Sequence, residues 1–385
     1  RNTDSVLFRT YMPRRLELAV QARLYQVPVM HVDRNLDRDP VRNPVDPELR
    51  VWDWNTSSNS EFESFLRRMI PQHLPMVFLE AFESSDGESY KSNWPSRPKL
   101  IWTSNAHQSN DMFKLWAAKM VEQGSTLVIG QHGGRCGLVK QFRTEQHDIQ
   151  ISDRYLSWGW KDPENSNVVP TGQLKAVSPG RVRSRKSGRI TLVTNTINQH
   201  ANEACQYLYA QQWPDYFEQL CEFVRLLPKE ARDLLTVRLY PIDCGWDQEL
   251  RWQERFENID LDLGERPLHK AIEKNRLVVS SANATSYLES LSADIPTIMF
   301  WGSGYQEIRQ SALVPLEMLE RVGVFHTSSA KAAQHVSTIW YDVEGWWASP
   351  DVSEAVDHFR NLYCHLPKNL SKRVAEVLRE TIDRP

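Results

Sequence analysis

Residues Arg276 to Trp301, with the sequence RLVVSSANATSYLESLSADIPTIMFW, indicate the fold more clearly than any other stretch of the chain. The short apolar run Leu277 to Val279 predicts a strand buried on both faces. Small polar residues follow, and then Leu288 and Leu291 mark a helix. A second apolar run, Thr297 to Trp301, predicts another strand. Strand, loop, helix and strand form a βαβ unit, so we expect a mostly parallel α/β sheet.

The loop of this unit follows the carboxyl end of its first strand, where open α/β sheets bind their ligands. Backbone N–H groups at the start of the next helix favour an anion. Glu289 stands about one helical turn further on, where a carboxylate is placed to accept from a pair of ribose hydroxyls. These features predict a nucleotide-sugar site. The residues expected to bind the donor here are Asn283, Thr285, Ser286 and Glu289.

The length and composition of the chain indicate a globular protein of two domains. Its 385 residues are too many for one compact core. Hydrophobic residues make up 41% and charged residues 25%, and a net charge of -3 gives no indication of nucleic-acid binding. We expect a Rossmann-like acceptor-side domain over residues 1–180, a donor domain over 181–330, and C-terminal helices over 331–385 that pack back on the first domain.

Cysteine usage favours a reducing compartment. The five cysteines are odd in number and none forms a Cys-x-x-Cys pair, so neither a disulfide framework nor a zinc ribbon is indicated. No apolar run approaches the roughly 20 residues that cross a bilayer. We therefore expect a cytoplasmic protein. A peripheral location at the inner membrane is compatible with this expectation.

Strands and helices alternate in both halves of the chain, which predicts two helix-covered sheets. The basic segment 176–189, with Pro and Gly but no periodicity, predicts a linker between them. The expected strands are Val27–Val32, Lys99–Thr103, Ser125–Ile129, Ile149–Ile151, Ile190–Thr194 and Thr236–Leu239. The expected helices are Glu61–Ile70, Asp111–Gln123, Asp215–Leu227, Pro267–Asn275, Ala330–Trp340, Val352–Tyr363 and Leu370–Ile382.

A glycine-rich loop, Gly130-Gln131-His132-Gly133-Gly134, follows the strand Ser125–Ile129. Adjacent glycines allow a backbone to approach a ligand closely. His132 is suited to acid, base or hydrogen-bonding work near neutral pH. We expect Gln131, Gly133 and Gly134 on the acceptor side of a cleft and His132 among the catalytic residues. The alternative is a tight turn with an incidental histidine.

Three carboxylates are candidates for catalysis, each with a structural alternative. Glu145 belongs to the ionisable run 143–148, which is either a solvated loop or part of the cleft beneath His132. Asp243 follows Arg238 and Tyr240 at a strand end, where Arg238 suits a phosphate, Tyr240 the donor, and Asp243 a nucleophile or base. Asp243 is alternatively a cap for the next helix. Asp215 lies at the start of a predicted helix and is the weakest of the three candidates.

Several familiar chemistries lack their motifs. The sequence contains no P-loop, no Gly-x-Ser-x-Gly nucleophile elbow and no Gly-x-Gly-x-x-Gly fingerprint. Asp37-x-Asp39 and Asp260-x-Asp262 have a metal-type spacing, but neither follows a clear strand. We assign no metal and no cofactor.

The expected two-domain architecture and the Glu289 helix with its Asp294-Ile295-Pro296 turn resemble GT-B glycosyltransferases, although Asp294 replaces the more usual glycine. The region 101–175 is more particularly similar to a family of transferases encoded in bacterial surface-polysaccharide gene clusters. The matching residues are Asn105, Asp111-x-Phe113-Lys114, Gly130–Gly134, Ile151-Ser152-Asp153-Arg154 and Trp158-Gly159-Trp160, with further matches at Arg238-Leu239-Tyr240, Asp243, Gly245-Trp246 and Glu344-Gly345-Trp346-Trp347. The likeness covers most of the chain.

The resemblance implies a GT-B glycosyltransferase that moves a sugar from a nucleotide-activated donor to a bacterial surface polysaccharide, either lipopolysaccharide O-antigen or capsule. It extends to the retaining β-Kdo transferase modules, which implies CMP-β-Kdo or a similar ulosonic acid as donor and no metal requirement. A double displacement would then need a carboxylate nucleophile, with Asp243, Asp215 and Glu145 available and His132 as acid/base partner. The expected partners are the donor, a glycan or lipid-linked glycan acceptor and other assembly modules.

Two alternatives belong to other functional classes. A sugar-nucleotide epimerase shares the GT-B fold and the donor loop. A non-catalytic scaffold of polysaccharide assembly would share the fold but bind no nucleotide.

Overall fold

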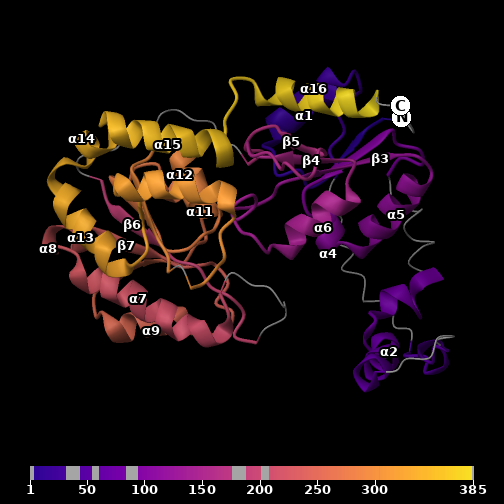
Figure 1. Cartoon of the computed structure of the whole chain (residues 1–385), viewed down its shortest axis with the longest axis horizontal. Coiled ribbons are helices and arrows are strands. Elements are labelled where there is room, and N and C mark those ends of the chain that lie inside the picture. The colour runs from indigo at the N-terminus through magenta and orange to yellow at the C-terminus, as the bar shows by residue number, and fades with distance from the viewer. Residues whose placement is uncertain are drawn as a thin grey trace.

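The protein contains two parallel β-sheets, each covered by helices, and they lie in separate halves of the molecule (Figure 1). The computed structural model describes residues 4–31, 44–53, 60–83, 94–175, 188–200, 208–302 and 304–383. Within these residues no helix is both long enough and apolar enough to cross a membrane.

The first sheet has five parallel strands in the order β1-β2-β3-β4-β5. All residues of β2 and β4 are buried, as expected for strands with helices on both sides. The strands are β1 (Val6–Leu7), β2 (Leu100–Thr103), β3 (Thr126–Gly130), β4 (Arg154–Ser157) and β5 (Val168–Pro170). The helices of this half are α1 (Arg14–Arg23), α2 (Glu61–His73), α4 (Ala106–Ser109), α5 (Asp111–Glu122) and α6 (Arg143–Ile151), with short 3-10 turns at Glu48–Arg50 and Met76–Phe78.

The second sheet has six parallel strands in the order β8-β7-β6-β9-β10-β11. This is the strand order 3-2-1-4-5-6 of dinucleotide-binding folds, with the topological switch point between β6 and β9. The strands are β6 (Ile190–Val193), β7 (Leu235–Arg238), β8 (Asp260–Asp262), β9 (Leu277–Ser280), β10 (Thr297–Phe300) and β11 (Phe325–His326). The helices are α7 (Trp213–Leu226), α8 (Lys229–Arg232), α9 (Gln248–Arg255), α10 (Leu268–Ile272), α11 (Thr285–Ser292), α12 (Gln310–Arg321) and α13 (Ser329–Ile339), with 3-10 turns at Ala210–Gln212 and Trp340–Asp342.

The C-terminal helices return across the molecule to the first half. α14 (Val343–Trp347) leads to α15 (Pro350–Tyr363), which packs against α11 and α12. α16 (Leu370–Ile382) lies along α1 of the first domain (Figure 1). Their apolar faces join one core with the first sheet, so the core passes from one half into the other.

The predicted fold class is confirmed: two Rossmann-like domains of the GT-B type with C-terminal helices packed back on the first. The βαβ unit predicted from residues 276–301 is β9, α11 and β10. The proposed boundary at 180/181 lies outside the described residues, so the domain limits stay predictions.

Two expected strands are wrong. Residues 149–151 belong to the end of α6, which buries Glu145, Asp148 and Ile149 at the i, i+3, i+4 spacing of a helix. Val27 to His31 form no strand, and Val32 lies outside the described residues. The short strands β1, β5 and β8 were not predicted because two or three residues show no period of their own.

Candidate functional site

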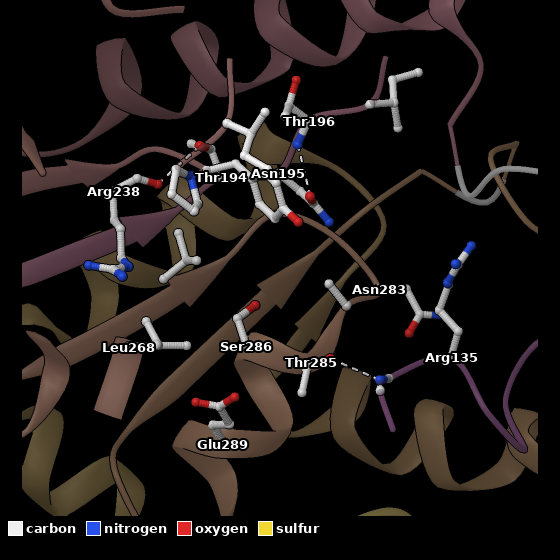
Figure 2. Close-up of a pocket in the computed structure, with 18 of the residues that line it drawn as sticks. Arg135, Thr194, Asn195, Thr196, Arg238, Leu268, Asn283, Thr285, Ser286 and Glu289 are labelled. Atoms are coloured by element: carbon white, nitrogen blue, oxygen red, sulfur yellow. Dashed lines mark hydrogen bonds between the residues drawn. The ribbon is translucent and has the colours of Figure 1, made fainter. Parts of the chain in front are cut away.

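A cavity of about 740 Å³ lies between the two sheets (Figure 2). Its walls are the loops that follow β3, β6, β7 and β9, at the carboxyl ends of these parallel strands. The loops after β6 and β9 flank the topological switch point, so the cavity lies where open α/β sheets bind their ligands. From the predicted site, His132, Gly133, Gly134, Arg238, Tyr240, Asn283, Thr285, Ser286 and Glu289 line it.

The two domains touch each other at the floor of this cavity. The backbone N–H of Gly134 donates to the Thr285 hydroxyl at 3.0 Å. A Cβ at Gly134 would lie 2.4 Å from the carbonyl oxygen of Ala284, whereas a Cβ at Gly133 would lie 3.4 Å from the Thr285 hydroxyl. Gly134 is therefore needed because two backbones meet here, and the contact joins the glycine-rich loop to the start of α11.

Polar side chains at the start of α11 are held by neighbours in their own domain. The Ser286 hydroxyl lies 2.9 Å from the Ser280 hydroxyl. Asn283 donates to Gln306 at 3.0 Å and accepts from the Tyr287 hydroxyl at 2.9 Å. These contacts fix the loop after β9 before any ligand enters.

Glu289 forms an ion pair with Lys175 across the cavity. The Lys175 ammonium lies 2.8 Å from the Glu289 carboxylate, and both residues line the cavity. Glu289 comes from α11, whereas Lys175 comes from the end of the first domain. The predicted ribose-binding carboxylate thus already has a cation beside it, supplied by the opposite wall.

Arg238 lines the cavity, but its guanidinium is engaged on the far side of β7. It contacts Asp262 of β8 at 2.5 Å and donates to the carbonyl oxygens of Gly264 and Arg266. The predicted phosphate contact of Arg238 would require these bonds to open. Tyr240, two residues along the chain, lines the cavity and is exposed.

His132 lines the cavity from the first domain. Its ring stacks on Tyr11 with the ring centroids 6.2 Å apart, and its Nδ1 is buried without a partner among the described residues. Burial lowers the pKa of His132 below its ordinary value, while the nearby Asp148 carboxylate opposes that shift. Asp148 itself contacts His107 at 2.7 Å. The neutral imidazole is therefore favoured near pH 7, as a general base requires.

Gln131 lies behind the glycine-rich loop and does not line the cavity. Its side-chain oxygen accepts from the backbone N–H of Trp158 at 3.0 Å and from the Trp160 indole at 2.9 Å. Its amide donates to the carbonyl oxygen of Gly133 at 2.9 Å. The structure thus places Gln131 as a buried support for the loop.

Glu145 is fully buried beneath the loop and outside the cavity. It accepts from the backbone N–H of Gly137 at 2.5 Å and pairs with Arg309, which comes from the second half of the chain. Burial raises the pKa of Glu145 to about 7, although Arg309 lowers it.

We expect the free energy of unfolding to depend on pH through Glu145. Its pKa is about 7 in the folded protein and 4.5 when unperturbed, so the stability that it contributes is complete below 4.5 and is lost as pH rises through 7. Between pH 5 and pH 8 the free energy of unfolding of the natural protein should fall by on the order of 2 kcal/mol relative to that of Glu145→Gln. Urea titrations of both proteins at the two pH values measure this, and parallel pH profiles would contradict it.

Asp243 and Asp215 are exposed and neither lines the cavity. The Asp243 carboxylate accepts from the backbone N–H groups of Gly245, Asp247 and Gln248 at 3.1, 2.9 and 2.7 Å. Burial alone would raise the pKa of Asp243, but these N–H groups outweigh it and lower the pKa. This is the capping arrangement that the sequence offered as the alternative for Asp243. Asp215 stands in the first turn of α7.

The cavity also contains residues that the sequence did not assign to the site. Arg135 follows the glycine-rich loop directly, so its position could have suggested it. Lys175 gives no such signal because its neighbours form no motif. The additional lining residues include Tyr11, Arg135, Phe142, Lys175, Thr194, Asn195, Thr196 and Leu268.

Asp260-x-Asp262 is the one Asp-x-Asp pair named above that lies among the described residues, and its carboxylates are paired with arginines. Asp260 and Asp262 contact Arg189 and Arg238, and Asp37 and Asp39 lie outside the described residues. No group of three or more His, Cys, Asp or Glu residues that could hold a metal ion occurs among the residues described.

Several solved structures are similar to this one at low sequence identity. A Staphylococcus aureus MnaA structure with UDP is 12% identical, with coverage of 99% of this chain and 97% of that chain and a TM-score of 0.49. A UDP-N-acetylglucosamine 2-epimerase is 12% identical, with coverage of 98% and 94% and a TM-score of 0.42. WaaG, a glycosyltransferase involved in lipopolysaccharide biosynthesis, is 10% identical, with coverage of 97% and 98% and a TM-score of 0.37. All three TM-scores lie below 0.5, so these likenesses carry no argument about the reaction.

The sequence itself gives the more informative comparison. No curated protein matches it significantly. The family model described as LIC12162 family transferase matches residues 2–378, which is nearly the whole length. The chain therefore belongs to the LIC12162 family of transferases.

Proposed function

We propose that this transferase moves a glycosyl group from a nucleotide-activated donor to a glycan of a bacterial surface polysaccharide. The observation that carries the proposal is the position of the cavity at the switch point of the second sheet, between the loops after β6 and β9. Membership of a transferase family and the resemblance to GT-B glycosyltransferases support the reaction class. A lipid-linked acceptor would bring the protein to the cytoplasmic face of the inner membrane.

The donor would lie on the wall formed by the second domain. Glu289 would accept from the ribose hydroxyls in exchange for Lys175, and the released ammonium would face the donor's anionic groups. Arg135 supplies a second cationic group in the cavity. Two cations suit a donor with a carboxylate and a phosphate, and we therefore propose CMP-β-Kdo or a similar ulosonic acid.

The acceptor would enter beside Gly133 and Gly134, with His132 as the acid/base residue. Among the described residues that line the cavity, Glu289 is the one carboxylate. A retaining double displacement needs a nucleophile. Asp243 is the candidate whose neighbours Ile242 and Cys244 line the cavity, so release of its cap on α9 would bring it nearest. Neither Asp215 nor Glu145 has a sequence neighbour that lines the cavity.

We expect His132→Gln to lower kcat by about 100-fold or more, because proton transfer by a positioned side chain contributes about that much. Nucleotide affinity should stay unchanged, since His132 stands on the acceptor wall. The matched control is His358→Gln, which removes an exposed histidine of α15. Steady-state transfer from the donor identified below measures both proteins, and full activity in His132→Gln would remove His132 from the mechanism.

A thermal-shift screen followed by product analysis tests the function itself. A nucleotide at a hundred times its dissociation constant should stabilise the fold by about 2.7 kcal/mol. Transfer that requires an acceptor glycan supports the proposal. Conversion of a UDP-sugar without an acceptor would instead identify an epimerase. Failure of CMP, UDP and GDP to stabilise the protein would favour a non-catalytic scaffold.

A further inference from the structure

Helix α2 carries its apolar side chains on the face that is turned to solvent. Phe62, Phe65, Leu66 and Ile70 are exposed by 69%, 48%, 41% and 44%. Pro71 is its one buried residue and lies opposite Phe62 around a helix of 3.6 residues per turn. A surface helix normally shows the reverse, with the apolar stripe toward the core. Figure 1 shows α2 at the edge of the molecule, away from both sheets.

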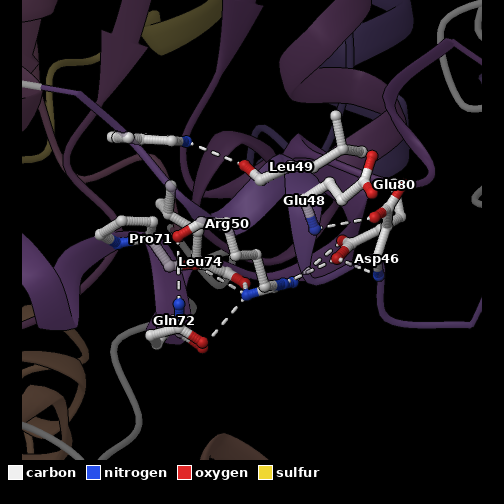
Figure 3. A network of polar contacts seen from close by, with 9 residues as sticks. Asp46, Glu48, Leu49, Arg50, Pro71, Gln72, Leu74 and Glu80 are labelled. Carbon is white, nitrogen blue, oxygen red and sulfur yellow. Dashed lines mark hydrogen bonds and ion pairs between the residues drawn. The ribbon is translucent and has the colours of Figure 1, made fainter.

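Polar contacts, and not apolar packing, fix this orientation (Figure 3). The Arg50 guanidinium contacts the Glu80 carboxylate at 2.7 and 2.9 Å. It also donates to the carbonyl oxygens of Pro71, Gln72 and Leu74 at 2.8, 3.1 and 3.1 Å, at the end of α2. Both charged side chains are buried, and the hydrogen bonds from Arg50 lower the pKa of Glu80 to about 2. The apolar face is therefore held outward by a satisfied polar core.

Exposed apolar side chains that lie together on a soluble protein mark an interaction surface, so the stripe on α2 calls for a cover. The charges of the helix are unevenly placed along it. Glu61 and Glu63 lie in the first turn, whereas Arg67 and Arg68 lie in the second half. An antiparallel copy of the same helix would set each acidic half against a basic half.

One register satisfies both the apolar and the charged positions. If Phe62 of one copy packs against Met69 of another, Phe65 lies opposite Leu66 in the antiparallel sequence, and Glu63 lies opposite Arg68 and one position from Arg67 of the second copy. Glu61 then lies two positions from Arg68 of that copy. Within a single chain Arg67 already pairs with Glu63, and exchange of this exposed pair costs little. A two-fold axis between Phe65 and Leu66 produces this arrangement, with the same patch used by both copies.

A membrane fits this surface less well than a second copy. The described segments 44–53 and 60–83, which comprise α2 and its neighbours along the chain, contain seven Asp or Glu and three Arg residues. Anionic lipid headgroups attract basic segments and repel acidic ones. The charge of this region therefore disfavours the surface of an anionic leaflet.

We propose that α2 is a self-association surface that pairs antiparallel with α2 of a second copy, through Phe62, Phe65, Leu66, Met69 and Ile70. One helix per copy buries less area than an obligate dimer, so the association depends on concentration. The surface is separate from the cleft, and the proposal stands independently of the proposed reaction.

Sedimentation velocity of the full chain over a concentration series tests the pairing. The natural protein should shift from monomer to dimer as concentration rises, and Phe65→Glu with Leu66→Glu should stay monomeric. The control is Leu250→Glu, which places a glutamate on an exposed apolar position of α9 and should dimerise normally. Circular dichroism melting checks that all three proteins are folded.

Charge reversal tests the antiparallel register. Glu61→Arg with Glu63→Arg makes α2 wholly basic, and Arg67→Glu with Arg68→Glu makes it wholly acidic, so each protein alone should remain monomeric. An equimolar mixture of the two should dimerise again. A natural protein that is monomeric throughout, a dimer that survives Phe65→Glu with Leu66→Glu, or a mixture that fails to associate would overturn the proposal. Binding of the monomer to anionic vesicles through the same face would overturn it in favour of a membrane.

Discussion

Replacement of Gly134 by alanine should reduce kcat/KM by about 100-fold or more while both domains stay folded, since misplacement by about 1 Å costs that much in a positioned site. The new Cβ would lie 2.4 Å from the carbonyl oxygen and 2.5 Å from the carbonyl carbon of Ala284. Both are backbone atoms, so no side-chain rotation relieves the clash. The glycine-rich loop must retreat from α11, and the two walls of the cavity separate.

Two glycine variants serve as controls for this effect. Gly304→Ala should be silent because nothing lies within 4 Å of its added Cβ. The kcat/KM of Gly133→Ala should lie between those of Gly134→Ala and Gly304→Ala, since its Cβ would meet only the Thr285 hydroxyl at 3.4 Å. Steady-state kinetics with each variant, together with small-angle scattering for the separation of the domains, measures the series. Equal activity of Gly134→Ala and Gly304→Ala would show that the contact between the domains does not matter for the reaction.

Replacement of Arg309 by methionine should lower the free energy of unfolding by about 3 kcal/mol at pH 8, because removal of one partner leaves a buried charge uncompensated. Arg309 pairs with Glu145, which has no exposed surface, and donates to the carbonyl oxygen of Val139 at 3.0 Å. Its own backbone N–H donates to the carbonyl oxygen of Leu138 at 2.8 Å. The pair therefore joins α6 of the first half to the start of α12 in the second half. Urea titration measures the loss.

The contrast with an exposed pair makes this prediction specific. Lys140 contacts Glu307 at 2.6 Å beside the same junction, with both side chains more than half exposed. Lys140→Met should therefore change stability by less than about 1 kcal/mol. At pH 5 the effect of Arg309→Met should shrink, because Glu145, with its pKa of about 7, is then protonated. Equal losses for Arg309→Met and Lys140→Met would contradict the burial argument.

Local patterns made the centre of the fold predictable. β9, α11 and β10 were recognisable because a buried parallel strand reads as an unbroken apolar run, and the glycine-rich loop was found because it follows such a run in β3. Both loops line the cavity. The sequence alone could place each loop at the end of a strand, but it could not show that the two loops face each other.

Long-range partners were not predictable in the same way. Arg238 suggested a phosphate contact, but β8 sets Asp262 beside it. That strand has three residues, too few to be recognised from the local sequence pattern. Glu145 meets Arg309 from 164 residues away. Lys175 reaches Glu289 only because the domains face each other. Each of these pairings decides whether a charged group is available to a ligand.

Calorimetric titration of CMP, UDP and GDP into the natural protein and into Ser286→Tyr shows whether the cleft is a nucleotide-sugar donor site. Ser286 lines the cavity at the switch point, and a tyrosine there would fill the proposed donor pocket. One nucleotide should bind the natural protein in equimolar ratio, and Ser286→Tyr, with an unchanged melting temperature, should not bind it. Absence of binding by all three nucleotides, or equal affinity in both proteins, would contradict a donor site in this cleft.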